Sequence, residues 1–351
     1  MQESKDTETS NEVKTNSIRQ LYDKILKRIL TLSAWAVVNL INGLFGMNFP
    51  PGSKVTYNWT ENVDDELEKT ISDAILTIHA WGKCYSYHIE AEINTADTNN
   101  STIVLRIFEY GLRDALRHRV TEDGKTKLKF PQPIIILLEH NSNSPDEVTL
   151  TLDFGASGEI DFVVPTMKFL DYSIEELDKK RMVILLPLYL LKFRKQVDKS
   201  KKLRNKGDAE ALRRDARAIK DMIDNGILKA IDENIEAGVI DNYDAYVLTE
   251  MLSKMYENLY GGLDVFKEEG VDSKMDDRLV LRIDVEVSKA RKEAALEAAL
   301  AATLANSRLI ARNLLAKGIV PELVAEATNL PIEEIKSLQL ELPDQPLPVA
   351  S

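Results

Sequence analysis

The chain has 351 residues, of which 44% are hydrophobic and 29% charged, as in an ordinary globular protein. Its single cysteine, Cys84, excludes an intrachain disulfide and suits a reducing cytoplasm, where we expect the protein to reside. The net charge of −12 argues against binding of nucleic acid through bulk charge, so such binding would need a local basic surface.

The N-terminal part predicts a tail followed by a long helix. Residues 1–16 are polar and are expected to form a disordered tail rather than a signal peptide. Residues 17–47 carry apolar side chains at helical spacing, up to a Pro-Pro-Gly turn. Within them, Ile29–Met47 is nearly long enough to span a bilayer, but it contains Asn39 and two glycines. We therefore expect a buried core helix and no contact with a membrane.

The next segments alternate between strand and helix patterns. Residues 54–60 and a hairpin at 70–93 predict strands, and residues 103–119 predict a helix with one apolar stripe. Three further strands are expected at 133–139, 148–154 and 159–164, separated by turn signals. This order predicts an α/β layer domain over residues 17–172.

The hairpin is expected to gather carboxylates on one face. With Gly82-Lys83 as its two-residue loop, Asp73 would lie opposite Glu92, and Ile75 opposite Glu90. Side chains alternate along a strand, so the three carboxylates would share a face within roughly 5–8 Å. Their repulsion has two interpretations, a bound hard cation such as Mg²⁺ or Mn²⁺, or a solvated face with mobile side chains. His88, on the same face, is either a supporting partner or a strand filler.

Two local runs of basic residues contrast with the acidic chain. The first extends from Arg106 to Lys129, and the second from Lys192 to Lys206 has only Asp198 against it. Such runs either bind phosphate groups or form solvated faces of helices.

The C-terminal half is almost wholly helical. Residues 173–270 predict a helical extension that begins at a capping signal, Ser173-Ile-Glu-Glu, and is kinked or broken at Pro187. Residues 271–351 contain an alanine-rich helix, expected at 278–317, which resembles a packing or self-association helix and predicts a homo-oligomer. Residues 314–338 have the order helix, turn, helix; this spacing could read DNA, but Glu333 and Glu334 would repel phosphates.

An aspartate, and a glutamate followed two residues later by a basic or amide residue, on adjacent strands, form the metal site of many phosphodiesterases. Asp73 and Glu90 correspond to its aspartate and first glutamate, and this assignment explains why position 92 would share a face with them. No nucleophile elbow or P-loop competes with it, and the four histidines lack zinc-ligand spacing with Cys84.

Several stretches, in order, resemble one nuclease family. They are Tyr22–Lys27, Leu40–Gly46, Ser72-Asp73, Tyr87–Glu92, Arg106–Tyr110, the strand pair from Phe130, and the tail ARNLLAKGIVPELVAEATNLPIEEIKSL. Together they resemble the Rpn-type recombination-promoting nucleases, also described as transposases, of the PD-(D/E)XK nuclease superfamily. The similarity spans about residues 20–200 and 308–338, and it rests on order and spacing rather than on any single motif.

The resemblance implies a PD-(D/E)XK-like α/β core, a central mixed sheet flanked by helices, and a DNA endonuclease that promotes recombination or transposition. It implies Mg²⁺ or Mn²⁺ held by Asp73, Glu90 and Glu92, with Arg106 and Tyr110 contributing from the following helix. Glu92 stands where the family has glutamine, and Gly43 where related chains carry an acidic residue that approaches the metal.

These departures leave alternatives open. Glu92 supplies the missing carboxylate in an active enzyme, or the chain is a catalytically degenerate DNA-binding or regulatory relative. A third possibility, from another class, is a self-associating helical scaffold built on residues 173–338.

Overall fold

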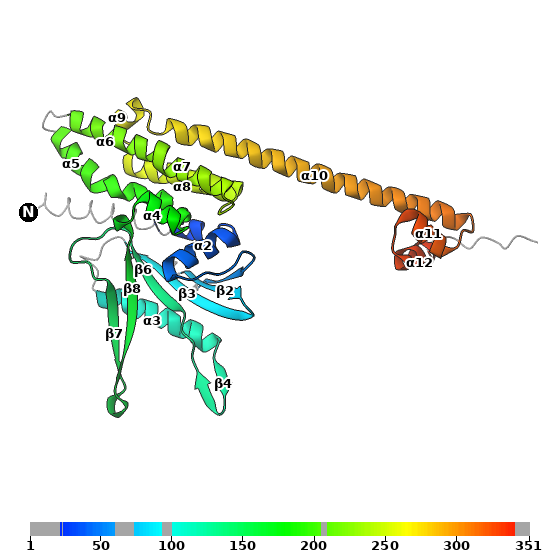
Figure 1. The fold of residues 1–351 in the computed structure, drawn as a ribbon, viewed down its shortest axis with the longest axis horizontal. Coiled ribbons are helices and arrows are strands. Elements are labelled where there is room, and N and C mark those ends of the chain that lie inside the picture. The colour runs from blue at the N-terminus through cyan, green and yellow to red at the C-terminus, as the bar shows by residue number, and fades with distance from the viewer. Residues whose placement is uncertain (1–21, 23, 60–73, 93–99, 205–208, 341–351) are drawn as a thin grey trace, which may run out of the picture. The chain divides into compact units, whose positions relative to one another are not determined.

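The computed structural model describes residues 22, 24–59, 74–92, 100–204 and 209–340. Packing divides the chain into two units, Met1–Ile283 and Asp284–Ser351. In the described part, the first unit contains a mixed sheet of six strands in the order β1-β2-β3-β6-β8-β7, with helices on both faces (Figure 1). The strands are β1 Lys54–Trp59, β2 Ala74–Ala80, β3 Lys83–Glu92, β6 Gln132–Leu137, β7 Glu147–Asp153 and β8 Glu159–Lys168. The expected α/β class with a mixed sheet is therefore confirmed.

Strand direction sets where side chains meet. The pairs β1–β2, β2–β3 and β7–β8 are antiparallel, whereas β3, β6 and β8 run parallel to one another. The chain passes from β3 to β6 through helix α3, Asn100–Arg117, and a small hairpin of β4, Val120–Glu122, and β5, Lys125–Lys127. The hairpin was not anticipated, and α3 begins and ends a few residues before the limits of the helix expected at 103–119.

The predicted register of the β2–β3 hairpin is wrong by one residue in the turn. Ala80 pairs with Lys83, so the loop is Trp81-Gly82, and Ile75 lies opposite His88 instead of Glu90. Both loop residues have positive φ, 51° and 70°, as the mirror-image hairpin turns require. Trp81 accepts this conformation while its ring packs 5.1 Å from that of Phe49.

The two faces of the sheet bury different cores. Helix α2, Ala34–Phe45, and the 3₁₀ segment Val183–Phe193 cover one face, where Tyr87 and Ile89 of β3 are buried. Helix α3 covers the opposite face, where its residues Ile103, Val104 and Ile107 pack against alternate residues of β6. The two helices are seen on opposite sides of the strands in Figure 1.

The helix expected over residues 17–47 is broken. A helix at Lys24–Leu30 meets α2 at an angle of 108°. The break is held by Ser33, whose backbone N–H and hydroxyl both donate to Asp244, at 2.8 and 2.5 Å. Burial raises the pKa of Asp244, and the hydrogen bonds from Ser33 act against that rise. The partner lies 211 residues away, so no local pattern could predict the break.

No single helix among the described residues is long and apolar enough to cross a membrane. The bent pair Lys24–Leu30 and Ala34–Phe45 passes the same test by length and composition when taken together. Ile29, Leu30, Val37 and Leu40 are fully buried inside the protein, as expected for core helices.

Helix α2 packs closely at one glycine. A Cβ on Gly43 would lie 2.5 Å from the carbonyl oxygen of Lys180 and 2.5 Å from Cγ of Met182. Relieving this contact would require movement of the backbone at Lys180, which is energetically costly. This position therefore excludes every side chain, including the acidic one that the family resemblance suggested.

Gly43→Ala should therefore lower the free energy of unfolding by about 1–3 kcal/mol, although alanine normally favours a helix interior over glycine. Urea denaturation measures this difference. Gly262→Ala is the matched control, because a Cβ there meets nothing within 4 Å, and its effect should stay below about 0.5 kcal/mol. An unchanged midpoint for the Gly43 variant would contradict the close packing.

The remaining helices of this unit share the core that contains α2. Ser173 and Glu176 form the predicted capping box at the start of α4. The segment around Pro187 is a 3₁₀ helix with almost every side chain buried. The further elements are α4 Ile174–Lys179, α5 Arg194–Arg204, α6 Glu210–Asp221, a π-helical stretch Met222–Ile227, α7 Leu228–Glu236, α8 Asn242–Tyr260 and α9 Asp264–Glu268.

The second unit is helical. Helix α10, Ser273–Ala316, continues into it and is followed by α11, Pro321–Thr328, and α12, Ile332–Leu340. Ala311, Val324 and Ile335 form its small core, and Asn329 turns the chain between the last two helices with a left-handed φ of 54°. Leu309, Ile310 and Leu323 are exposed. Self-association through these helices stays a prediction.

Candidate functional site

The carboxylates of β3 lie on the face that α3 covers. His88, Glu90 and Glu92 alternate with Tyr87 and Ile89, as the two-residue period predicted. His88 is 1% exposed, Glu90 6% and Glu92 9%. The interpretation as a solvated face with mobile side chains is therefore wrong for these residues. Buried carboxylates require compensating positive charge or hydrogen bonds.

Helix α3 brings Arg106 onto this face. Its apolar residues pack on β6, and this orientation directs Arg106 toward β3. The Nη2 group of Arg106 donates to Oε1 of Glu90. The Arg106 side chain remains 35% exposed, so it reaches the buried carboxylate from solvent. The position expected for Arg106 from sequence, facing the acidic cluster, is the position that the structure shows.

Tyr110 lies one turn further along α3 and contacts a different residue. Its ring centre is 6.4 Å from that of His88, in an edge-on arrangement, and its side chain is buried. Arg106 and Tyr110 are about 6 Å apart along the helix axis, and Glu90 and His88 are about 6.6 Å apart along the strand. Because these spacings are similar, Arg106 can lie beside Glu90 while Tyr110 lies beside His88. His88 is thus an ordered neighbour of Tyr110 rather than an isolated strand filler.

Asp73, the third expected ligand, lies outside the described residues, and its predicted position opposite Glu92 is not described. Among the described residues, no group of three or more His, Cys, Asp or Glu side chains is arranged to hold a metal ion. Glu90 and Glu92 supply two buried carboxylates on one face, a donor type that suits Mg²⁺ or Mn²⁺. The described donors therefore fit part of such a site.

Gly43 is not part of this site. It lines a cavity of about 310 Å³ together with Gln132, Ile134 and Met167, on the face of the sheet covered by α2. Glu90 and Glu92 occupy the opposite face. The hypothesis that Glu92 replaces a carboxylate missing at Gly43 is therefore not supported by the geometry.

Another buried carboxylate, that of Glu139, lies at the end of the sheet where β3 ends, and it was not predicted from the sequence. Glu139 follows β6 and is 6% exposed; it pairs with Nη1 of Arg194 at 3.0 Å, and Nζ of Lys195 lies at 3.9 Å. Glu92 is opposite Leu137 in the parallel pair β3–β6, so both strands end at one edge. The sequence signal was an acidic residue at the end of the apolar run expected to form the strand 133–139.

The surroundings of Arg194 are buried as well. Tyr22 is 1% exposed, and burial raises its pKa to about 12, with the charge of Arg194 acting in the opposite direction. Beside Glu139, Nε2 of His140 lies 2.8 Å from Oδ1 of Asp171, at the end of β8. The carboxyl ends of the three parallel strands thus carry several ionisable groups, Glu92, Glu139, His140 and Asp171, at the place where open α/β sheets commonly bind ligands.

Comparison with known proteins identifies no relative of this chain. No family model, no curated protein and no solved structure matches the chain.

Proposed function

We propose that this protein is a metal-dependent DNA endonuclease with a PD-(D/E)XK-like core, linked to recombination as the sequence resemblance implies. The observation that carries the proposal is the buried pair Glu90 and Glu92 on one face of β3, with a guanidinium from the next helix against it. The mixed sheet flanked by helices supports it. So does strand β2, adjacent to β3, whose first residue directly follows Asp73.

Glu90 and Glu92, together with Asp73, would hold Mg²⁺ or Mn²⁺ through carboxylate oxygens. Such an ion, when bound, lowers the pKa of a water ligand and stabilises negative charge on a phosphate. The two buried carboxylates share this face with the Arg106 guanidinium, and carboxylate oxygens are the donors that a divalent cation of this kind prefers.

Arg106 has the geometry of a phosphate ligand. Its fork of donors can hold two oxygens at once, and its partial exposure leaves it accessible to a strand of DNA. Tyr110, one turn further along α3, packs against His88, the neighbour of Glu90 on the same face of β3. We assign Arg106 to the phosphodiester and Tyr110 to a positioning role.

Incubating the purified full-length protein with supercoiled plasmid tests the proposal. Nicked or linear DNA should accumulate with Mg²⁺ or Mn²⁺, and little product should form with EDTA. The protein with Asp73→Ala, purified in the same way, controls for a contaminating nuclease. If the plasmid stays intact with Mg²⁺, Mn²⁺ and Ca²⁺, the proposed activity is wrong.

One observation favours a second candidate, a catalytically degenerate DNA-binding relative. The ion pair with Arg106 already neutralises Glu90, which is what a purely structural pair would do. In that case the protein would bind DNA without cutting it, and titration calorimetry would detect no Mn²⁺ binding that depends on Glu90. An active enzyme must bind the ion in the same measurement.

A further inference from the structure

The sequence left open whether the basic residues of helix α5 bind phosphate groups or only form a solvated face. We propose that a row of three lysines on α5, Lys195, Lys199 and Lys202, here called the α5 lysine row, binds the phosphate backbone of the DNA. This inference rests on the proposed function, because it names how the substrate of that site is held.

The α5 lysine row lies on the solvent side of its helix. Val197 and Ser200 are the buried residues of α5, and at about 100° per residue the three lysines lie about 140–200° around the helix from Val197. All three are exposed, and Lys195 is 70% exposed. The row is about 10 Å long, which matches the axial rise of about three phosphates on one DNA strand.

The row also begins beside the candidate site. Lys195 and its neighbour Arg194 contact Glu139, and Glu139 is two residues beyond Leu137, the partner of Glu92 in the sheet. Two residues of chain span at most about 7 Å, so α5 starts at the edge where β3 ends. A strand of DNA that lies along the row would therefore lead toward Glu90 and Glu92.

In the part of the chain that the structure describes, three basic side chains of α5 have a carboxylate partner, Arg194 and Lys195 with Glu139 and Lys201 with Asp198, and the other three have none. The helix contains six Lys and Arg side chains and one acidic residue, Asp198, which is 3.4 Å from Lys201. On the adjacent helix α6, in contrast, Arg213 faces Glu268 and Arg217 faces both Glu210 and Glu269. Within the described residues, no ion pair joins Lys199 or Lys202 to a carboxylate. Positive charge at this site, in a chain of net charge −12, suits a polyanion.

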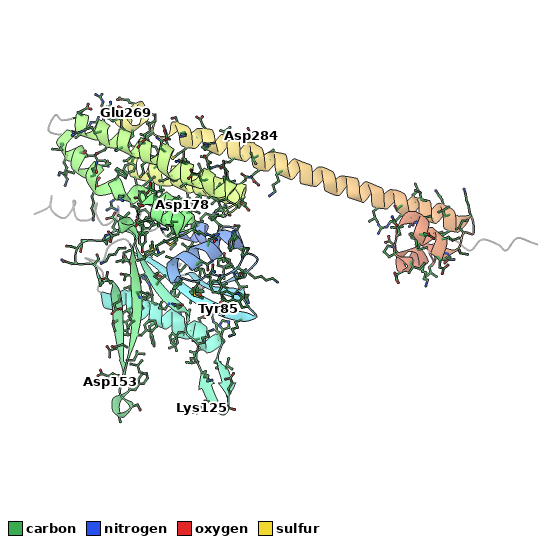
Figure 2. All side chains as sticks on the ribbon, viewed as in Figure 1. Tyr85, Lys125, Asp153, Asp178, Glu269 and Asp284 are labelled. Atoms are coloured by element: carbon green, nitrogen blue, oxygen red, sulfur yellow. The ribbon has the colours of Figure 1, made fainter. Side chains whose placement is uncertain are left out.

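Part of the other basic run lies elsewhere: Arg119, Lys125 and Lys127, on and beside the β4–β5 hairpin, are here called the hairpin run. Lys125 is on the β4–β5 hairpin, which projects from the body on the same side as Tyr85, near the start of β3 (Figure 2). Lys129 donates to the carbonyl oxygen of Cys84, at 2.9 Å, also near the start of that strand. The site residues are at the end of β3, so the hairpin run is the less suitable of the two for guiding DNA to them.

Fluorescence anisotropy with a labelled DNA duplex in EDTA would test the α5 lysine row without cleavage. The triple variant Lys195→Gln, Lys199→Gln, Lys202→Gln should bind at least about tenfold more weakly than wild type at 0.1 M salt. The slope of log Kd against log salt should fall by about 2–3, roughly one for each lost phosphate contact. The corresponding Lys→Arg triple variant keeps the charge and should bind nearly as wild type does.

A matched control removes the same charge from the hairpin run, as Arg119→Gln, Lys125→Gln, Lys127→Gln, and should change affinity by less than about threefold. Circular dichroism and thermal melting verify that each variant is folded. Equal losses of affinity in the two triple variants would mean that DNA binding depends on overall positive charge and not on the α5 lysine row. This result would contradict the proposal, as would an unchanged salt slope. So would binding to anionic phospholipid vesicles in place of DNA, and so would the absence of DNA binding by wild type.

The two proposals fail separately. If wild type binds DNA through the row but never cleaves it, the endonuclease proposal fails and the contact remains. If wild type cleaves plasmid and the row variant binds and cleaves equally well, the contact is wrong and the endonuclease proposal remains.

Discussion

Glu90→Ala should lower the rate of metal-dependent cleavage by at least about 10³-fold, since the change removes a buried ligand charge from the proposed ion site. Asp73→Ala should have an effect of the same size. Single-turnover nicking of plasmid at saturating Mg²⁺ measures both. A Glu90→Ala protein that keeps more than a tenth of wild-type activity would contradict the assignment.

Removal of Glu90 also leaves Arg106 without its carboxylate partner, so a loss of folding must be separated from a loss of catalysis. Glu90→Gln keeps the shape and one acceptor, and it should melt close to the wild-type temperature while remaining inactive. Glu109→Ala is the matched control on α3, because Glu109 is exposed and pairs with Arg113 on the same helix, and it should retain full activity. Glu92→Gln introduces the glutamine that the nuclease family resembled by this sequence has at that position, and it should keep or raise activity.

Patterns within one element of the site could be read from sequence. The two-residue alternation of β3 placed Glu90 and Glu92 on a single face, and the family resemblance suggested Arg106 on the following helix, where the structure pairs it with Glu90. These patterns depend on neighbours along the chain, so an error in the limits of an element does not change them. The burial of that face did not follow, because it depends on where α3 packs.

Relations between elements were harder to predict. The hairpin register failed because glycine was given the first loop position, whereas Trp81 occupies it with positive φ. The break before α2 depends on Asp244, and the pairing of Glu139 depends on Arg194, far along the chain in each case. Such contacts follow from tertiary packing and leave no period in the sequence. Gly43 shows the same limit, because its close contact comes from the end of α4.

Arg106→Lys should lower turnover by about 10²–10³-fold with little change in metal affinity, if Arg106 holds the phosphodiester. Lysine keeps the positive charge near Glu90 but loses the fork that binds two oxygens. Single-turnover rates give the first quantity, and Mn²⁺ titration calorimetry on the same protein gives the second. Arg113→Lys, on an exposed part of the same helix, should change neither.

The alternative role for Arg106 is that of a structural counter-ion to Glu90, and it makes the opposite prediction. A counter-ion needs only charge, so lysine would restore near-normal cleavage and an unchanged melting temperature. The partial exposure of the Arg106 side chain favours the phosphate role, because a purely structural partner of a buried carboxylate gains nothing from facing solvent. Unchanged turnover in Arg106→Lys would rule out the phosphate clamp, whatever the metal affinity, and would leave the ion pair as part of the fold.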